Sequence, residues 1–495
     1  MSRTGWRFGE LKGDLPQVAR PVGLLMIGVA IAMAASGLVG VAMGSREGAV
    51  HMGVSALIVG VLAGIALWLG RNARLDDLSR RNALLVVTVS WATLCVVGGL
   101  PFLIGADFRP SEAIFESTSG FTTTGATILP EIEGRLNPAL HFWRMLSHWL
   151  GGMGIVVLFV AVFPALGVGG KHLFRSEVPG PRSKGLSPRI RESASVLWKV
   201  YVLFTTVEIV LLWLAGLPIF EAVVHAFSTM GTGGFSTQNA SVGGFDKVLV
   251  EMIVLVFMVV AGMNFGLFHE ALRKGPSVIW KDIQTRAYFG ILAAVTVLCA
   301  VVILPEAGSV GDAFRFSSFQ TASIMSTTGF GTADFELWPS ATRMLLLILF
   351  FTGGCSGSTA GGMKLIRVII LVKAAVSELK RSFRPHLIDP VRVGRAVVSN
   401  QSLTGILAFM GVYVMTVGLG AIWVALVEDV DGTTSIMASL ACVANVGPGF
   451  GMVGPTDNFG FFSGPTKLVL SALMLLGRLE FLTVLALLTP GFWRR

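Results

Sequence analysis

The chain has 495 residues, of which 53% are hydrophobic and only 14% are charged, and its mean hydropathy is +0.74. Soluble domains carry roughly 25% charged residues, so the composition excludes a soluble globular protein and predicts an all-α polytopic membrane protein. The formal net charge of +9 does not indicate a nucleic-acid partner, because the basic residues gather in short segments between apolar ones.

Ten apolar segments are long enough to cross a lipid bilayer, which takes about 20 helical residues. In chain order they are 22–43, 50–70, 83–104, 139–165, 196–217, 247–270, 287–305, 341–373, 400–427 and 466–490. The first lies behind a basic leader. Its apolar run is longer than that of a signal peptide and a second span follows at once, so we expect an uncleaved anchor.

Six short segments hold 29 of the 38 Lys and Arg residues. They are 1–20, 71–81, 171–199, 273–286, 364–395 and 494–495. By the positive-inside rule, such segments are cytoplasmic. Ten crossings place all of them on the same side, so the sequence predicts a multi-pass protein with both termini in the cytoplasm.

Four segments on the presumed external side share one layout, in which a short apolar stretch leads into a polar strip and a glycine. They are AIFESTSGFTTTGATIL (113–129), AVVHAFSTMGTGGFSTQ (222–238), FQTASIMSTTGFGTADF (319–335) and MASLACVANVGPGFGMV (437–453). Alignment places Gly125, Gly234, Gly329 and Gly447 in register, 109, 95 and 118 residues apart. Self-similarity of this kind indicates an internal repeat.

Each strip lies between two predicted spans, so each unit should contain a helix, a re-entrant half-helix and a second helix. The predicted units are 80–170, 190–275, 285–375 and 396–495, after a leader and an extra helical hairpin over 1–75. Repeats of this kind predict a pseudo-fourfold bundle of about ten transmembrane helices around a central ion pore.

The strips themselves indicate a cation pathway. Irregular backbone at membrane depth is tolerated only inside protein or along a water-filled cavity. Glycine allows the backbone to turn carbonyl groups to one side, and rings of carbonyls can replace the hydration shell of a monovalent cation. The negative C-terminal ends of the half-helices would also favour a cation.

A second glycine-rich stretch, FFTGGCSGSTAGGMKLIR (350–367), interrupts the predicted span 341–373. Each glycine costs about 1 kcal/mol in a helix interior, so this helix should break. We expect an intramembrane loop that gates the pore, formed by Gly353, Gly354, Gly357, Ser358, Thr359, Gly361 and Gly362. The alternative is a close-packed helix interface made of small residues.

Charged residues within membrane spans are costly, so they are expected either to pair with other polar groups or to have a function. Arg478 is the clearest case, and its alternatives are a place near the pore or a buried pair with Glu480 or a neighbouring acid. We expect Lys364 to reach the cytoplasmic interface and Glu208 to pair with a helix neighbour. Arg144 should pack against the first half-helix. The histidines near span ends, which are His141, His148, His225 and His269, have no metal-binding motif and are interpreted as interfacial residues.

The repeat, with TTTGAT (122–127), GTGGFST (231–237), STTGFGTADF (326–335) and ANVGPGFG (444–451), resembles the Trk/Ktr/HKT superfamily of potassium transporters, and within it the TrkH/TrkG-type uptake subunits. This resemblance implies a selectivity filter around the four aligned glycines. The preceding residues would add carbonyl layers: Thr123, Thr124, Thr232, Gly233, Thr327, Thr328, Asn445 and Val446. The pair Gly231 and Thr232 departs from the commonest family pattern, in which an aliphatic pair is usual.

The resemblance also implies the rest of the system. Potassium would be the substrate, held by the filter residues, with no cofactor and no transition metal, and the gate would include Arg478 facing the pore. The expected partners are a second copy of the chain and a cytosolic TrkA-type nucleotide-binding subunit, for which the basic segments 166–195 and 374–399 would be docking surfaces. The expected location is the bacterial inner membrane.

Other functions remain alternatives at this point. A secondary transporter of a small solute would use the broken span 341–373 as its binding site, but such folds usually show two repeats. A sodium-selective cation transporter is a further alternative, because glycines alone do not fix selectivity. No paired catalytic carboxylates, Gly-x-Ser-x-Gly, HExxH or nucleotide-binding loop is present in the sequence, so we expect no enzyme.

Overall fold

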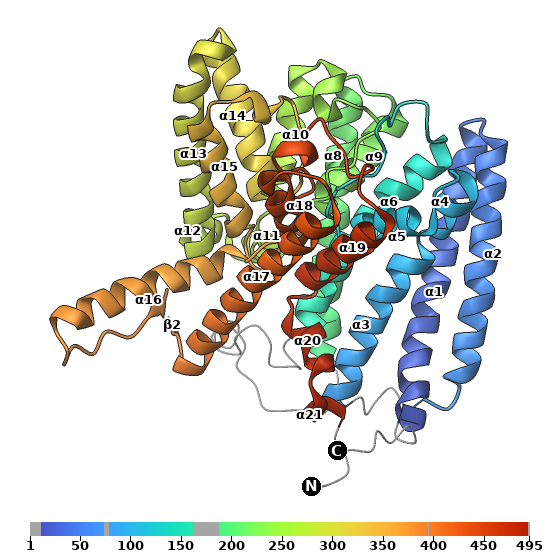
Figure 1. Ribbon diagram of the computed structural model, residues 1–495, viewed down its shortest axis with the longest axis horizontal. Helices are drawn as coiled ribbons and strands as arrows, with labels where there is room; N and C mark the ends of the chain where they lie inside the picture. The colour runs from blue at the N-terminus through green and yellow to red at the C-terminus, as the bar shows by residue number, and fades with distance from the viewer. Residues whose placement is uncertain (1–10, 74–78, 162–187, 395, 494–495) are drawn as a thin grey trace.

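The computed structural model describes residues 11–73, 79–161, 188–394 and 396–493, and these form a helical bundle (Figure 1). An antiparallel hairpin of α1 (Leu11–Ala42) and α2 (Arg46–Leu69) lies at one side and packs on α3 (Arg80–Val97), α4 (Leu100–Gly105) and α6 (Pro138–Ala161). The rest of the bundle contains the four polar strips. This is the leading hairpin that the sequence predicts.

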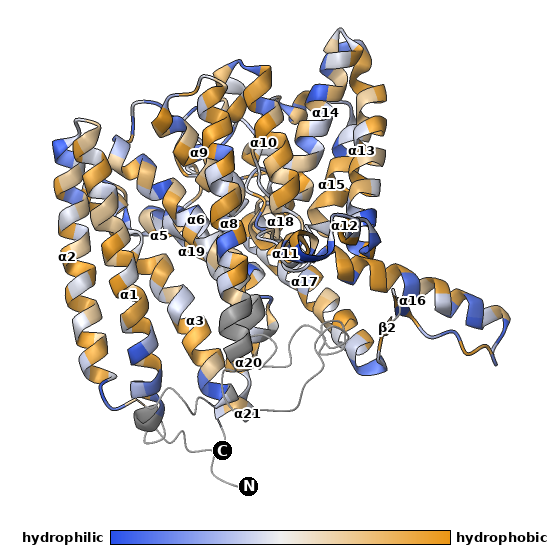
Figure 2. Ribbon diagram, turned by 180° about the vertical axis from the view of Figure 1, so that it is seen from behind, coloured by the Kyte–Doolittle hydropathy of each residue, from blue (hydrophilic) through white to orange (hydrophobic). Residues whose placement is uncertain are grey.

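In the described part of the chain, six helices are individually long and apolar enough to cross a membrane. They are α1, α2, α3 continued by α4, α8 (Pro188–Leu214), α13 (Ile283–Ala307) and α17 (Asn400–Val427). Their outward faces are largely hydrophobic, with hydrophilic residues near the helix ends (Figure 2). Exposed side chains such as Leu38, Leu57, Leu214 and Leu426 make these faces suited to contact lipid.

The other predicted crossings correspond to broken helices and to α6. The predicted span 341–373 is divided into α15 (Ser340–Thr352) and α16 (Leu365–Phe383). Two spans predicted as continuous are also broken, so those predictions were wrong. Span 247–270 bends by 90° between α10 (Val248–Ala261) and α11 (Phe265–Lys274), and span 466–490 is divided into α19 (Gly464–Arg478) and α20 (Leu482–Leu488).

Local backbone features mark both breaks. At the first, Gly262 ends α10, and the Asn264 side chain accepts a hydrogen bond from Gly266 N at 2.8 Å, which starts a new helix. At the second, Glu480 and Phe481 adopt left-handed backbone angles, with φ of +57° and +49°. Left-handed residues do not continue a right-handed helix.

Four half-helices lead into the strips: α5 (Pro110–Phe121), α9 (Ile219–Gly231), α14 (Val310–Met325) and α18 (Gly432–Ala444). Two of them begin at side-chain caps, because Ser309 accepts from Asp312 N and Asp431 accepts from Thr433 N and Thr434 N. Caps of this kind are each worth about 1 kcal/mol. Most residues of α18 and the second half of α14 are buried, so these helices form part of the core.

The order of packing closes the bundle into a ring. The helix that follows each strip packs against the half-helix of the next unit: α6 on α9, α10 on α14, α15 on α18, and α19 on α5. The last of these contacts joins the end of the chain to the beginning of the repeat. The polar strips are thereby brought together at the centre.

Shorter elements complete the described part of the chain. They are α12 (Ser277–Lys281), α21 (Pro490–Trp493), the 3-10 turns η2 (Ser241–Phe245), η3 (Phe335–Leu337) and η4 (Gly451–Val453), and the antiparallel strands β1 (Arg392–Val393) and β2 (Ala396–Val397). In Figure 1, α16 extends sideways from the bundle. Arg81 joins the first and last helices, because it pairs with Asp14 at 3.1 Å and lies over the Trp493 ring.

Candidate ion pathway

The four aligned glycines form a closed ring, here called the glycine ring: Gly125, Gly234, Gly329 and Gly447. A Cβ atom on each would overlap with a backbone carbonyl of the next strip: Gly233 O, Thr328 O, Val446 O and Thr124 O respectively. Their φ angles are +82°, +80°, +82° and +93°, which side-chain-bearing residues rarely adopt. Space and conformation therefore both require glycine at these positions.

A second left-handed residue lies two positions before each member of the ring. Thr123, Thr232, Thr327 and Asn445 have φ angles between +54° and +57°. Left-handed backbone is costly for threonine and costs asparagine less, so it persists only where the surroundings enforce it. All four residues are fully buried. The same backbone path is thus built four times from different side chains.

Several polar side chains of the strips hydrogen-bond within the protein. Thr122 and Thr124 share a hydrogen bond of 2.8 Å between their hydroxyls, and Ser326 and Thr328 share one of 2.7 Å. The Asn445 amide donates to Thr124 Oγ1 at 2.9 Å, which joins the fourth strip to the first. These hydroxyls therefore help to fix the strips to one another.

A cavity of about 100 Å³ lies next to the glycine ring, on the side of the residues that follow the ring glycines. All four ring glycines line it, together with Asp457, Asn458 and residues of the first two strips. The twelve residues predicted to form a filter thus lie within four strips that touch one another. Among the described residues, no group of three or more His, Cys, Asp or Glu side chains is placed to hold a metal ion.

The glycine-rich segment 353–364, here called the gate loop after its expected role, is not helical and lies against the residues of the strips that precede the ring glycines. Gly361 N donates to Thr327 Oγ1 at 2.7 Å, and a Cβ on Gly361 would lie 2.5 Å from Ala444 O. Gly353, Gly357 and Gly362 have positive φ angles of +63°, +80° and +71°. The helical small-residue interface considered from the sequence is therefore wrong.

The gate loop is also attached to the bend between α10 and α11. Cys355 N donates to Gly262 O at 2.8 Å, and Phe265 N donates to Gly357 O at 3.2 Å. The Thr359 hydroxyl adds a bond to Ala261 O at 3.2 Å. The broken helix therefore supplies the free backbone groups that hold the loop, a contact between units that local sequence patterns do not contain.

Arg478 contacts the gate loop directly. Its Nη1 donates to Thr359 O at 2.8 Å and its Nη2 to Gly151 O at 3.3 Å. The alternative of a pair with Glu480 is wrong, because Glu480 instead pairs with Arg367 at 2.6 Å. Among the described residues Arg478 makes no ion pair, so it is a buried cation balanced by backbone carbonyls.

One further prediction about a charged residue was wrong. Lys364 does not extend to the cytoplasmic interface; it is buried, and its Nζ donates to Ala360 O at 2.6 Å. A loop carbonyl buried at membrane depth needs a hydrogen-bond donor, and Lys364 is buried because it supplies one. Glu208 is fully buried, and its polar partner is Thr229 of the neighbouring helix α9, which agrees with the expected pairing with a helix neighbour; it forms no ion pair with another described residue.

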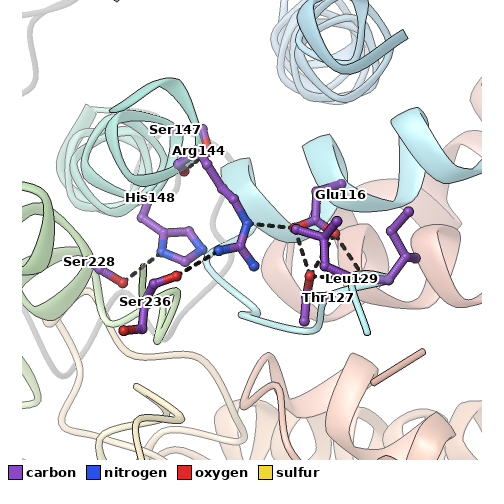
Figure 3. Close-up of polar contacts among 9 residues, drawn as sticks. Glu116, Thr127, Leu129, Arg144, Ser147, His148, Ser228 and Ser236 are labelled. Atoms are coloured by element: carbon purple, nitrogen blue, oxygen red, sulfur yellow. Dashed lines mark hydrogen bonds and ion pairs between the residues drawn. The ribbon is translucent and has the colours of Figure 1, made fainter. Parts of the chain in front are cut away.

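The sequence interpretation missed the polar side chains behind the first two strips (Figure 3). His148, interpreted as interfacial, is buried, stacks on Phe235 at 4.2 Å and shares a 3.0 Å hydrogen bond with Ser228. His225 is also buried. Arg144 packs against the first half-helix as expected, but through an ion pair with the buried Glu116 at 2.6 Å. Aligning the positions nine residues before each ring glycine would have drawn attention to Glu116 and His225, but not to Arg144 or His148.

Comparison with known proteins shows which family shares this sequence and fold. A family model described as "TrkH: Cation transport protein" matches residues 52–491. The chain is 39% identical over 486 residues to the "Trk system potassium uptake protein TrkH" of Salmonella typhimurium, covering 96% of this chain and 99% of that protein. It is 34% identical over 430 residues to the "Trk system potassium uptake protein TrkG" of Escherichia coli, covering 84% and 86%.

A solved structure agrees with these relatives. The crystal structure of the potassium transporter TrkH from Vibrio parahaemolyticus matches with a TM-score of 0.88 and 35% sequence identity, over 97% of this chain and 99% of that one. A family match over most of the chain, the relatives and the shared fold all agree. The chain belongs to the TrkH family of cation transport proteins.

Proposed function

We propose that this chain takes up potassium ions across the inner membrane of a bacterial cell. The observation that carries the proposal is the glycine ring, in which each strip comes close to a carbonyl of the next strip. Carbonyl rings of this kind can replace the water around a potassium ion. The names of the relatives, which describe potassium uptake, support the same substrate.

In this proposal the glycine ring and the residues before it form the filter. The carbonyls of Thr123 and Thr124, and of the matching pairs Thr232 and Gly233, Thr327 and Thr328, and Asn445 and Val446, are its ion-binding layers. Each half-helix ends at its strip, so its negative C-terminal end favours a cation there. The walls of the ion pathway are formed by the four repeat units, 80–170, 190–275, 285–375 and 396–495. Both chain termini lie in the cytoplasm.

The gate loop closes the pathway below the filter. Gly353, Gly354, Gly357, Ser358, Thr359, Gly361 and Gly362 form this loop, which lies against the inner residues of the strips. Arg478 holds the loop in place and adds a positive charge beside the path, which raises the barrier for a cation. We assign the chain no cofactor and no catalytic chemistry.

A flux experiment separates this function from solute transport. We expect proteoliposomes that contain the purified chain to take up potassium and rubidium faster than sodium, and not to take up an uncharged solute, because the carbonyl ring provides a site for a dehydrated cation. Radiotracer uptake measures each rate. Equal uptake of the uncharged solute would contradict the proposal, and faster sodium than potassium uptake would make this a sodium transporter.

For partners, we propose a second copy of the chain and a cytosolic nucleotide-binding TrkA-type subunit. Of the two proposed docking segments, the one within the described residues is 374–394 with 396–399; it includes most of α16, which extends from the bundle (Figure 1), and exposes Lys380, Arg381 and Arg384. Most of the other proposed surface, 166–195, lies outside the described residues.

Size-exclusion chromatography tests this docking. Mixing the two purified proteins should shift this chain to an earlier elution volume, and deletion of residues 374–395 should abolish the shift because it removes the exposed basic surface. The deleted chain must still elute as the unmixed wild type does. A shift that survives the deletion would place the docking surface elsewhere.

A further inference from the structure

Behind the first two strips lies an ion pair that the potassium pathway does not itself require. Arg144 of α6 and Glu116 of α5 are 2.6 Å apart between Nε and Oε1, with side chains only 1% and 0% exposed. A buried ion pair is weak evidence for stability, because desolvation of the two charges offsets their attraction. The question is therefore what the pair holds in place (Figure 3).

The two ends of the pair reach two different strips. The Glu116 carboxylate accepts from Thr127 Oγ1 at 2.9 Å and from Ile128 N at 3.0 Å, just after the first ring glycine. Arg144 Nη1 donates to Ser236 O at 3.1 Å, just after the second ring glycine, and its guanidinium lies 3.5 Å over the Phe235 ring. The Glu116–Arg144 pair therefore connects the first strip to the second.

In two of the other three units, the residue at the position equivalent to Glu116 also hydrogen-bonds to its strip. The residues nine positions before the four ring glycines are Glu116, His225, Gln320 and Ala438. His225 Nε2 shares a 2.9 Å hydrogen bond with Ser236 Oγ, and Gln320 Nε2 donates to Ala333 O at 3.1 Å. Each polar side chain thus contacts its own strip, and Ala438 has no polar group to do so. The first unit differs because Arg144 extends its contact to a second strip.

We infer that the Glu116–Arg144 pair is a positioning pair that sets how well the filter distinguishes potassium from sodium. The inference rests on the proposed function. The first two strips also meet in the glycine ring, where Gly125 lies against Gly233 O. A fixed distance between them resists the inward movement of carbonyls that a smaller ion needs. The pair carries no net charge, and Arg144 also lines the cavity at the glycine ring; the inference assigns the effect of the pair to the position of the two strips.

Two variants test this inference by reversal-potential measurements in reconstituted bilayers. Glu116→Gln removes the ion pair and keeps a side chain of the same shape. The double variant Glu116→Gln with Arg144→Gln leaves no uncompensated buried charge, so it serves if the single variant folds poorly. We expect the potassium-to-sodium permeability ratio to fall roughly tenfold in both, which corresponds to about 1.4 kcal/mol of lost discrimination, while potassium is still conducted.

Glu251→Gln is the matched control. Glu251 of α10 and Arg315 of α14 form a partly buried pair at 3.5 Å, and no hydrogen bond from either side chain to a strip is present in the described part of the chain. Its permeability ratio should equal that of the wild type. A similar fall in this control would show that any lost ion pair loosens the filter, and would overturn the specific role of Glu116 and Arg144.

A second readout does not depend on flux. Potassium bound to the folded protein should raise its melting temperature more than sodium does, because a ligand stabilises the state that binds it. In both Glu116 variants this difference should shrink. An unchanged difference and an unchanged permeability ratio would overturn the inference but not the pathway. Normal conduction by a Gly329→Ser variant would instead overturn the pathway itself.

Discussion

Replacement of Gly329 by serine is expected to reduce potassium uptake to the level of empty vesicles. A Cβ at this position overlaps with Val446 O, and the φ of +82° is one that serine rarely adopts. The carbonyl that would contact the ion must therefore move. Gly125→Asp should have the same effect, because its Cβ overlaps with Gly233 O. Uptake by a potassium-auxotrophic host and tracer flux in proteoliposomes both measure the loss.

Gly331→Ser is the control for this prediction. Gly331 lies two residues further along the same strip, its φ is not positive, and no atom lies within 4 Å of an added Cβ. The control should reach the membrane and conduct as the wild type does. If Gly329→Ser and Gly125→Asp reach the membrane in normal amounts and conduct potassium at the wild-type rate, the filter assignment is wrong.

Replacement of Arg478 by alanine is expected to raise potassium flux through the chain in the absence of any regulatory subunit. The change removes the donor to Thr359 O, so the gate loop is held less firmly. It also removes a buried positive charge from beside the path. Both effects lower the barrier for a cation, and we expect roughly a tenfold faster flux if the change lowers it by about 1.4 kcal/mol. Passive rubidium uptake into proteoliposomes measures the effect.

Arg478→Lys separates the two causes. Lysine keeps the charge but lacks the planar fork with which arginine reaches both Thr359 O and Gly151 O. Flux close to that of the wild type would show that the charge dominates, whereas flux close to that of the alanine variant would show that loop attachment dominates. An alanine variant that is folded and conducts no faster than the wild type would contradict the role of Arg478 in the gate.

The glycine ring could be located from the sequence because its signal is local and repeated. Each of the four ring residues lies three or four residues after the end of its half-helix, so alignment alone brings them into register. The gate loop was also visible, since its glycines cannot continue a helix in the middle of a span. These features depend on backbone conformation, which nearby residues determine.

The contacts that join the units could not be predicted in the same way. Arg144 reaches partners that are 28 and 92 residues away in the chain, and Arg478 reaches Thr359 from 119 residues away. Helix periodicity carries no information on such distances. The bend at Gly262 is a similar case, because the segment is apolar enough for a straight span and the gate loop supplies the partners that favour the bend.

The most direct test of the central claim is the reversal potential of the reconstituted chain in a planar bilayer, with potassium, sodium and proton gradients varied independently. The filter described above predicts a reversal potential that follows the potassium gradient and moves much less with the sodium gradient, and no current in the Gly329→Ser variant. A reversal potential set by sodium, or a current that persists unchanged in Gly329→Ser, would contradict potassium conduction through the glycine ring.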